Sequence, residues 1–411
     1  MSRELVVYSP DALQTYGHCH DYVRGLGGRL AALGWDVHVV AWEGPLALPD
    51  PLRAAGVPRP DWWSLPRSRF RRYSALIGDV IYGLVRIQSE RRLIAALEEA
   101  LRARPEAAVL YESFEYVGLA RHLRRERSDR SRVTIVHDAG FNTQHASPVA
   151  AAYKSLVRRQ VRAIVARSTT VLVHGPHMKR ALEANVGLAS TLAERVGVIP
   201  YGAPSPREVS LSEPGAARAQ LGIAATGRLA LAFGTLRRDK RFDFVLKGLA
   251  RAPGWSLLVA GPEGDLSYDA FLAQAARAGV ADRVVLHRGF VGPERHALYF
   301  GAADIVLAVY DSRIRHESGT GQLSRTFLRP VIACGGPDLE AYVRETGCGW
   351  VADSDDASSL AAALQAFDRL DETGIRDLRR RIEEAADARS WQAVAVRVDA
   401  LLRPAAPRDQ A

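Results

Sequence analysis

The sequence has little cysteine and no long apolar run. Three cysteines in 411 residues, Cys19, Cys334 and Cys348, are too few and too scattered for a disulfide framework or a metal cluster. No apolar run reaches about 18 residues, so we expect no membrane-spanning helix. The first residues turn polar too quickly for a signal peptide and predict a buried strand instead. These absences favour a protein of the cytoplasm.

The charge balance is positive, with 55 basic and 46 acidic residues and a net charge of +9. Such a balance suits an anionic substrate, an anionic membrane surface or nucleic acid. Nucleic acid is disfavoured because the sequence has neither a known binding motif nor basic residues interleaved with aromatics. The basic cluster 67–72 precedes an apolar helical face at 75–86. It leaves two alternatives open, a peripheral contact at the inner membrane face and a solvated loop before a core helix.

Short apolar segments alternate with segments of helical spacing along the whole chain, whose length suits two domains. Strands separated by helices predict parallel sheets that are buried on both faces. We therefore expect an α/β fold of two doubly wound, Rossmann-like domains. The expected strands are 5–8, 37–40, 107–111, 133–136, 171–173 and 196–199, then 229–233, 256–260, 283–286, 305–308, 331–333 and 349–351.

A stretch rich in proline and glycine, 200–206, interrupts this alternation and indicates a linker. Ligands of doubly wound sheets bind at the carboxyl ends of the strands, so we expect a site in a cleft between the domains. The predicted organisation is an N-terminal domain over 1–200, a linker over 201–226, a C-terminal domain over 227–384, a helix over 385–403 that returns to the N-terminal domain, and a disordered tail over 404–411.

Glycines and cations gather after the expected strands of the C-terminal domain. Glycine at a strand end lets the backbone approach a ligand, as at Gly234, Gly261 and Gly289. Gly234 also opens a basic segment whose cations could neutralise a diphosphate: Arg237, Arg238, Lys240 and Arg241. A turn can explain any one of these glycines, and a solvated loop can explain the basic segment. Because all of them would line one edge of one sheet, together they favour a nucleotide site.

A Ser-Gly turn opens a short helix after a later strand, in the segment His316-Glu317-Ser318-Gly319-Thr320-Gly321. The N-terminus of a helix that begins on serine and glycine offers unpaired N–H groups and a positive dipole end. We therefore expect this turn to bind a diphosphate.

Over roughly 195–352 the sequence resembles the retaining GT-B glycosyltransferases, in the family-4-like group (glycosyl transferases group 1) that uses nucleotide-activated sugars. The resemblance rests on a glycine followed six residues later by Lys240, on the Ser318-Gly319 turn, on the Gly-Gly…Glu segment 335–340 and on the strand-end histidine His137. It implies the GT-B fold and sugar transfer from a nucleoside-diphosphate sugar to an acceptor hydroxyl, with retention of configuration. It also implies that neither metal nor cofactor is needed.

The resemblance further implies roles for single residues. His137 and Lys240 would be catalytic. The donor would be bound by Gly234, Thr235, Arg237, Arg238, Lys240, Gly261, Phe290, Glu317, Ser318, Gly319, Thr320 and Gln322. The acceptor or the transferred sugar would meet the N-terminal domain at Gly17, His18, His20, Glu112 and Asp138. The acidic run 353–356 we interpret as a helix start and not as a metal site.

Two acidic positions depart from the family pattern. Many members carry two glutamates eight residues apart, and the corresponding positions here are Arg315 and Leu323. Glu317 lies two residues after the first of these positions. The Ser-Gly branch of the family also lacks the second glutamate. A catalytically silent relative that acts as a binding partner, or a nucleotide-sugar epimerase, is the alternative. The acceptor class stays open among a soluble metabolite, a glycan and a lipid-linked molecule.

Overall fold

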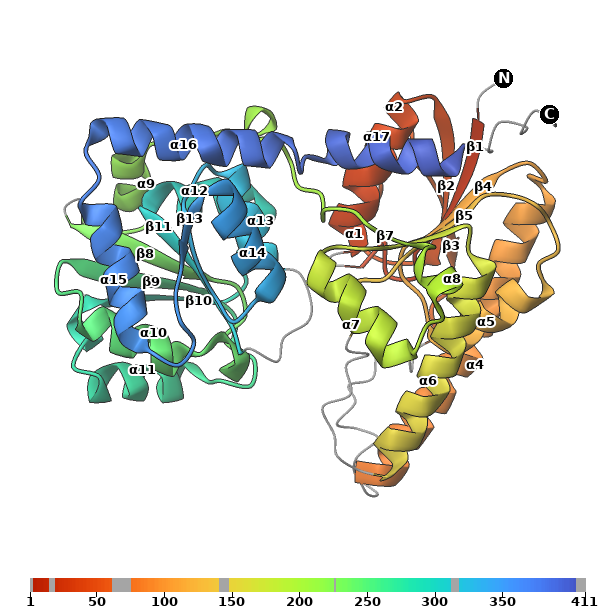
Figure 1. Ribbon diagram of the computed structural model, residues 1–411, viewed down its shortest axis with the longest axis horizontal. Coiled ribbons are helices and arrows are strands. Elements are labelled where there is room, and N and C mark those ends of the chain that lie inside the picture. The colour runs from red at the N-terminus through yellow and green to blue at the C-terminus, as the bar shows by residue number, and fades with distance from the viewer. Residues whose placement is uncertain are drawn as a thin grey trace. The chain divides into compact units, whose positions relative to one another are not determined.

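The computed structural model describes residues 3–14, 19–60, 75–139, 148–224, 227–311 and 318–403. The chain forms two compact units. The N-terminal unit comprises Met1–Gly202 with Trp391–Ala411, and the C-terminal unit comprises Ala203–Ser390. Each unit is a parallel β-sheet with helices packed against it (Figure 1). The expected α/β fold of two Rossmann-like domains is thus confirmed.

The sheet of the N-terminal unit has seven parallel strands in the order β3-β2-β1-β4-β5-β6-β7. The strands are β1 (Arg3–Tyr8), β2 (Trp35–Trp42), β3 (Arg53–Val57), β4 (Ala108–Tyr111), β5 (Arg132–Ile135), β6 (Thr170–Val173) and β7 (Val196–Val198). The helices are α1 (Cys19–Tyr22), α2 (Gly28–Ala32), α4 (Ala75–Arg102), α5 (Tyr116–Arg125), α6 (Pro148–Arg167), α7 (Pro176–Val186), α8 (Ser190–Ala193) and α17 (Trp391–Leu402).

The sheet of the C-terminal unit has six parallel strands in the order β10-β9-β8-β11-β12-β13. The strands are β8 (Arg228–Phe233), β9 (Trp255–Gly261), β10 (Val284–Arg288), β11 (Ile305–Val309), β12 (Val331–Cys334) and β13 (Gly349–Val351). The helices are α9 (Pro214–Gln220), α10 (Phe242–Ala250), α11 (Tyr268–Arg277), α12 (His296–Ala302), α13 (Gly319–Thr326), α14 (Pro337–Thr346), α15 (Ala357–Asp368) and α16 (Glu372–Asp387).

The apolar runs of the sequence became the buried strands because each has helices packed on both faces. Every residue of β4 and β11 is buried. The edge strand β3 was not predicted, and its residues are almost all exposed, so no apolar pattern marks it. None of the helices in the described parts of the chain combines the length and apolar character that crossing a bilayer requires.

The connections between the units lie at Gly202–Ala203 and Ser390–Trp391. The structure therefore differs from the predicted linker over 201–226, because the segment from Ala203 belongs to the C-terminal unit and contains α9. Helix α17 belongs to the N-terminal unit, where Trp391, Val394 and Leu402 join the hydrophobic core. The predicted disordered tail over 404–411 lies outside the described residues.

Candidate functional site

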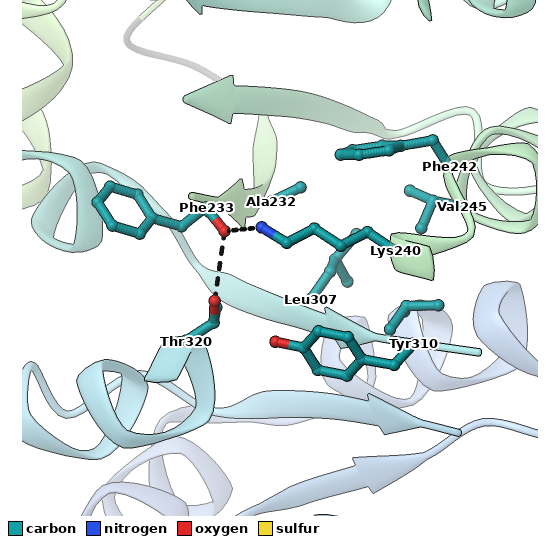
Figure 2. Close-up of a pocket in the computed structure, with 9 residues that line it drawn as sticks. Ala232, Phe233, Lys240, Phe242, Val245, Leu307, Tyr310 and Thr320 are labelled. Carbon is teal, nitrogen blue, oxygen red and sulfur yellow. Dashed lines mark hydrogen bonds between the residues drawn. The ribbon is translucent and has the colours of Figure 1, made fainter. Parts of the chain in front are cut away.

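A small pocket lies at the carboxyl ends of β8 and β11 in the C-terminal unit, with Lys240 inside it (Figure 2). We call it the Lys240 pocket. Its open space would hold about one water molecule. The wall is mostly apolar and is formed by Ala232, Phe233, Lys240, Phe242, Val245, Leu307, Val309, Tyr310 and Thr320.

Lys240 is held against the end of β8. Its Nζ donates a hydrogen bond of 2.5 Å to the carbonyl oxygen of Phe233, and the Thr320 hydroxyl donates to the same oxygen at 3.3 Å (Figure 2). Burial, together with the positive charge of Arg237, lowers the pKa of the Lys240 ammonium to about 7, although Asp239 acts in the opposite direction. The pocket thus holds a lysine whose charge would be stabilised by an anion.

Helix α13 begins beside this pocket. Ser318 is its N-cap, and its Oγ accepts a hydrogen bond of 3.0 Å from the Gly321 amide and lies 2.7 Å from the buried Tyr310 hydroxyl. The predicted helix start is therefore confirmed. Gly319 and Thr320 form its first turn, and Gln322 is buried further along. The positive end of a helix dipole thus lies in the same region as the Lys240 ammonium.

Two glycines allow close backbone packing next to Lys240. Gly234 and Gly261 have φ values of +89° and +153°, which side chains other than glycine rarely adopt. A Cβ atom at Gly261 would overlap the carbonyl oxygen of Gly234. The ends of β8 and β9 can therefore lie against each other only with glycine at this position.

The other expected donor residues point to different partners. Arg237 pairs with Asp239 at 3.1 Å, and the amide and side chain of Arg238 bond to Asp265. The methyl group of Thr235 lies where a Cβ atom on Gly264, in the turn after β9, would meet it. Phe290 follows β10 and is 75% exposed. The predicted Glu317 lies outside the described residues. Among the described cations that follow Gly234, Lys240 is thus the one whose side chain lines the pocket.

A chain of polar side chains occupies the carboxyl ends of four strands in the N-terminal unit. We call Ser9, Glu112, His137 and His174 the strand-end chain. The Ser9 hydroxyl donates to Oε2 of Glu112 at 2.6 Å, and His137 Nε2 lies 2.9 Å from Oε1 of the same carboxylate. His174 Nε2 lies 2.8 Å from His137 Nδ1. The predicted residues Glu112 and His137 are thus brought together.

Aromatic rings surround the two histidines. Tyr22 packs edge-on against His137 with centroids 5.0 Å apart, and Tyr201 lies 4.9 Å from His174. Trp391 of α17 packs edge-on against Tyr22 at 5.0 Å. The strand-end chain therefore has a rigid apolar wall, which restricts rotation of both imidazole rings.

The remaining predicted residues of this unit lie apart from that contact. His20 Nδ1 lies 2.8 Å from the carbonyl oxygen of Ala12, and Asp138 is half-buried next to His137. Gly17, His18 and the basic cluster 67–72 lie outside the described residues. The sequence reasoning did not assign Ser9 or Tyr310. Ser9 follows its strand directly, so the strand-end rule that selected His137 could have found it.

The acidic run 353–356 forms a helix start, as interpreted from the sequence. Asp356 is the N-cap of α15, and its side chain accepts a hydrogen bond of 2.8 Å from the Ser358 amide. This bond lowers the pKa of the Asp356 carboxyl. The aspartate thus has a structural partner within its own helix.

Comparison with known proteins gives a partial family match and a shared fold. Residues 19–202 match the glycosyl transferase 4-like domain. The whole chain has the GT-B fold: it is similar to a sucrose-phosphate synthase from Thermosynechococcus elongatus with a TM-score of 0.73 and 20% identity, covering 97% of this chain and 98% of that one. The domain match and the shared fold support a GT-B glycosyltransferase family.

Two further solved structures share the fold. Anabaena HepE in complex with UDP and glucose has a TM-score of 0.67 and 14% identity, with 97% of this chain and 99% of that chain covered. WaaG, a glycosyltransferase involved in lipopolysaccharide biosynthesis, has a TM-score of 0.61 and 16% identity at the same coverages. A comparison with curated proteins found no match.

Proposed function

We propose that the protein transfers a sugar from a nucleoside-diphosphate sugar to an acceptor hydroxyl, with retention of configuration and without a metal. One observation carries the proposal: the Lys240 ammonium, the Thr320 hydroxyl and the N-terminus of α13 converge at the carboxyl ends of β8 and β11. Ligands of doubly wound sheets bind at this edge. The glycosyl transferase 4-like match over 19–202 supports the same class of reaction.

The leaving group of this reaction is a nucleoside diphosphate, which gains negative charge as the glycosidic bond breaks. A preorganised cation and the N–H groups of a helix N-terminus stabilise such charge in the transition state. Lys240 and the first turn of α13 supply both, so they would do the work that a metal ion does in other transferases. The structures of HepE with UDP and with UDP-glucose support a sugar nucleotide as donor for this fold.

The proposal is tested by nucleoside diphosphate release. UDP-, GDP- and ADP-sugars would be offered with a panel of acceptors that includes soluble metabolites, glycans and lipid-linked molecules. We expect one donor to release its diphosphate in an acceptor-dependent way, in the presence of EDTA, and NMR of the product to show the anomeric configuration of the donor. Donor binding without turnover on any acceptor would instead identify a silent relative, and a free epimerised donor an epimerase.

A further inference from the structure

One tyrosine side chain joins the carboxyl ends of two neighbouring strands of the C-terminal sheet. The hydroxyl of Tyr268 donates a hydrogen bond of 3.0 Å to the carbonyl oxygen of Gly261 and accepts one of 2.8 Å from the amide of Gly289. Gly261 is the last residue of β9, and Gly289 follows β10 directly. We propose that Tyr268 is a positioning residue for donor binding, which holds these two strand ends at the rim of the nucleotide site. This role rests on the proposed function, because it assumes that the site binds a sugar nucleotide.

The position of Tyr268 follows from the way helix α11 begins. Ser267 is the N-cap, and its hydroxyl oxygen accepts a hydrogen bond of 3.2 Å from the amide of Ala270. Tyr268 is therefore the first residue of the helix, and its own amide donates to Oε1 of Glu263 at 2.5 Å. Further along the helix, Phe271 is fully buried in the core of the unit. The backbone that carries the tyrosine is thus fixed by the cap, by the turn after β9 and by the core.

The ring of Tyr268 makes a second contact with β10. The guanidinium of Arg288, the last residue of β10, lies over the ring, 5.1 Å from its centroid. The pairing of β9 with β10 ends with Arg288 opposite Gly261. Tyr268 therefore connects the two strands at the point where their backbone pairing ends, through both its hydroxyl and its ring.

The two strand ends differ in how they are held without the tyrosine. The end of β9 is also held on its other side, because the amide of Gly234 donates a hydrogen bond of 2.8 Å to the carbonyl oxygen of Ala260. In contrast, β10 is an edge strand of the sheet, and its residues are half-buried or exposed. Of the two strand ends, that of β10 therefore depends more on Tyr268.

The segment that follows β10 carries a residue expected from the sequence to bind the donor. Phe290 comes directly after Gly289, and its side chain is 75% exposed. Gly289 has a φ of +94°, and a Cβ atom there would meet no described atom within 4 Å, so the space beside it is open. An exposed aromatic ring at the ligand-binding edge of a sheet can stack on a nucleobase. Tyr268 would thus hold the turn from which Phe290 meets the nucleoside of the donor.

Hydrogen–deuterium exchange of the full chain, with no ligand present, tests the bridge itself. Tyr268→Phe keeps the ring and removes only the hydroxyl, so the amide of Gly289 loses its partner. We expect that amide to exchange about tenfold faster or more, with unchanged exchange in β8. The control is Tyr342→Phe, because the Tyr342 hydroxyl is buried and has no hydrogen-bond partner in the described part of the chain. Unchanged exchange at Gly289 in Tyr268→Phe would overturn the proposal.

Calorimetric titration with UDP, GDP, ADP and inorganic pyrophosphate tests the positioning role. Tyr268→Phe should bind the nucleoside diphosphate that the wild type prefers at least about fivefold more weakly, because the turn after β10 is no longer held. Its affinity for pyrophosphate should stay within about twofold of the wild type, because the Lys240 pocket keeps its own contacts. Tyr342→Phe should match the wild type for both kinds of ligand.

The same titrations separate this role from the proposed function. If the wild type binds none of the nucleoside diphosphates, the proposed function fails and the positioning role fails with it. If the wild type binds one and Tyr268→Phe binds it equally well, the positioning role alone is wrong. An equal loss for nucleoside diphosphate and pyrophosphate would also refute the role, because the effect would then lie in the Lys240 pocket or in the fold as a whole.

Discussion

The ammonium of Lys240 donates a 2.5 Å hydrogen bond to the main-chain carbonyl of Phe233, the last residue of β8. This bond fixes the lysine at the sheet edge where ligands of such folds bind. Burial lowers its pKa to about 7, so near neutral pH the charged and neutral forms are both populated. An arriving diphosphate would favour the charged form. The lysine is thus positioned before the ligand binds, and binding of the anion would shift it to the fully protonated form.

Diphosphate binding should take up a proton above pH 7. The pKa of Lys240 without ligand is about 7, and a bound anion raises it, so the complex holds a proton that the unliganded protein has lost. Calorimetric titration of nucleoside diphosphate in buffers of different ionisation enthalpy measures this uptake. We expect little uptake from Lys240 at pH 6, an uptake approaching one proton by about pH 8.5, and an affinity that falls as pH rises. Equal uptake in Lys240→Met would show that another group is responsible.

Ser318 and Tyr310 should depend on each other for stability. Ser318→Ala removes the N-cap of α13, which costs about 1 kcal/mol, and deprives the buried Tyr310 hydroxyl of its 2.7 Å partner, which costs about 1–3 kcal/mol more. Adding Tyr310→Phe should recover part of this loss, because the hydroxyl is then absent. Urea unfolding of the two single variants and the double variant measures the coupling. Strictly additive effects would contradict the proposed contact.

Gly261→Ala should destabilise the C-terminal unit. Its φ of +153° is strained for alanine, and the new Cβ would overlap the Gly234 carbonyl oxygen. We expect a loss of about 2 kcal/mol or more and weaker diphosphate binding, since Gly234 is adjacent to Lys240. Gly254→Ala is the matched control, because a Cβ there meets no atom within 4 Å. Thermal unfolding compares the two, and equal midpoints would show that the close approach does not matter.

Trp391 and Gly202 should be coupled where α17 begins. The Trp391 ring lies where a Cβ on Gly202 would be, so Gly202→Ala must displace it. Trp391→Ala leaves a cavity in the N-terminal core, at a cost of about 3–5 kcal/mol. In the double variant the alanine at 202 has room, so the combined loss should be smaller than the sum. Denaturant titration measures it, and a combined loss equal to the sum would exclude the steric conflict.

The sequence predicted the sheets well because their strands are apolar on both faces. Edge strand β3 escaped notice because four of its five residues are exposed. The Ser318 cap and the position of Lys240 at a strand end followed from local pattern. The pairing of Arg238 with Asp265 did not, because these two residues are 27 positions apart in the sequence and become neighbours only in the folded loop. The link from Glu112 to His174 likewise needs the strand order, which brings distant segments side by side.

The most direct measurement of the central claim is the affinity for nucleoside diphosphates, determined by calorimetry at pH 7 for the wild type, Lys240→Met and Lys247→Met. Lys247 is an exposed lysine of α10 in the same unit, so its substitution controls for loss of one charge. The account predicts at least about a tenfold weaker binding in Lys240→Met alone, since a charged hydrogen bond contributes ~1.5–3 kcal/mol. Wild-type affinity in Lys240→Met, or equal losses in both variants, would contradict a diphosphate site at the Lys240 pocket.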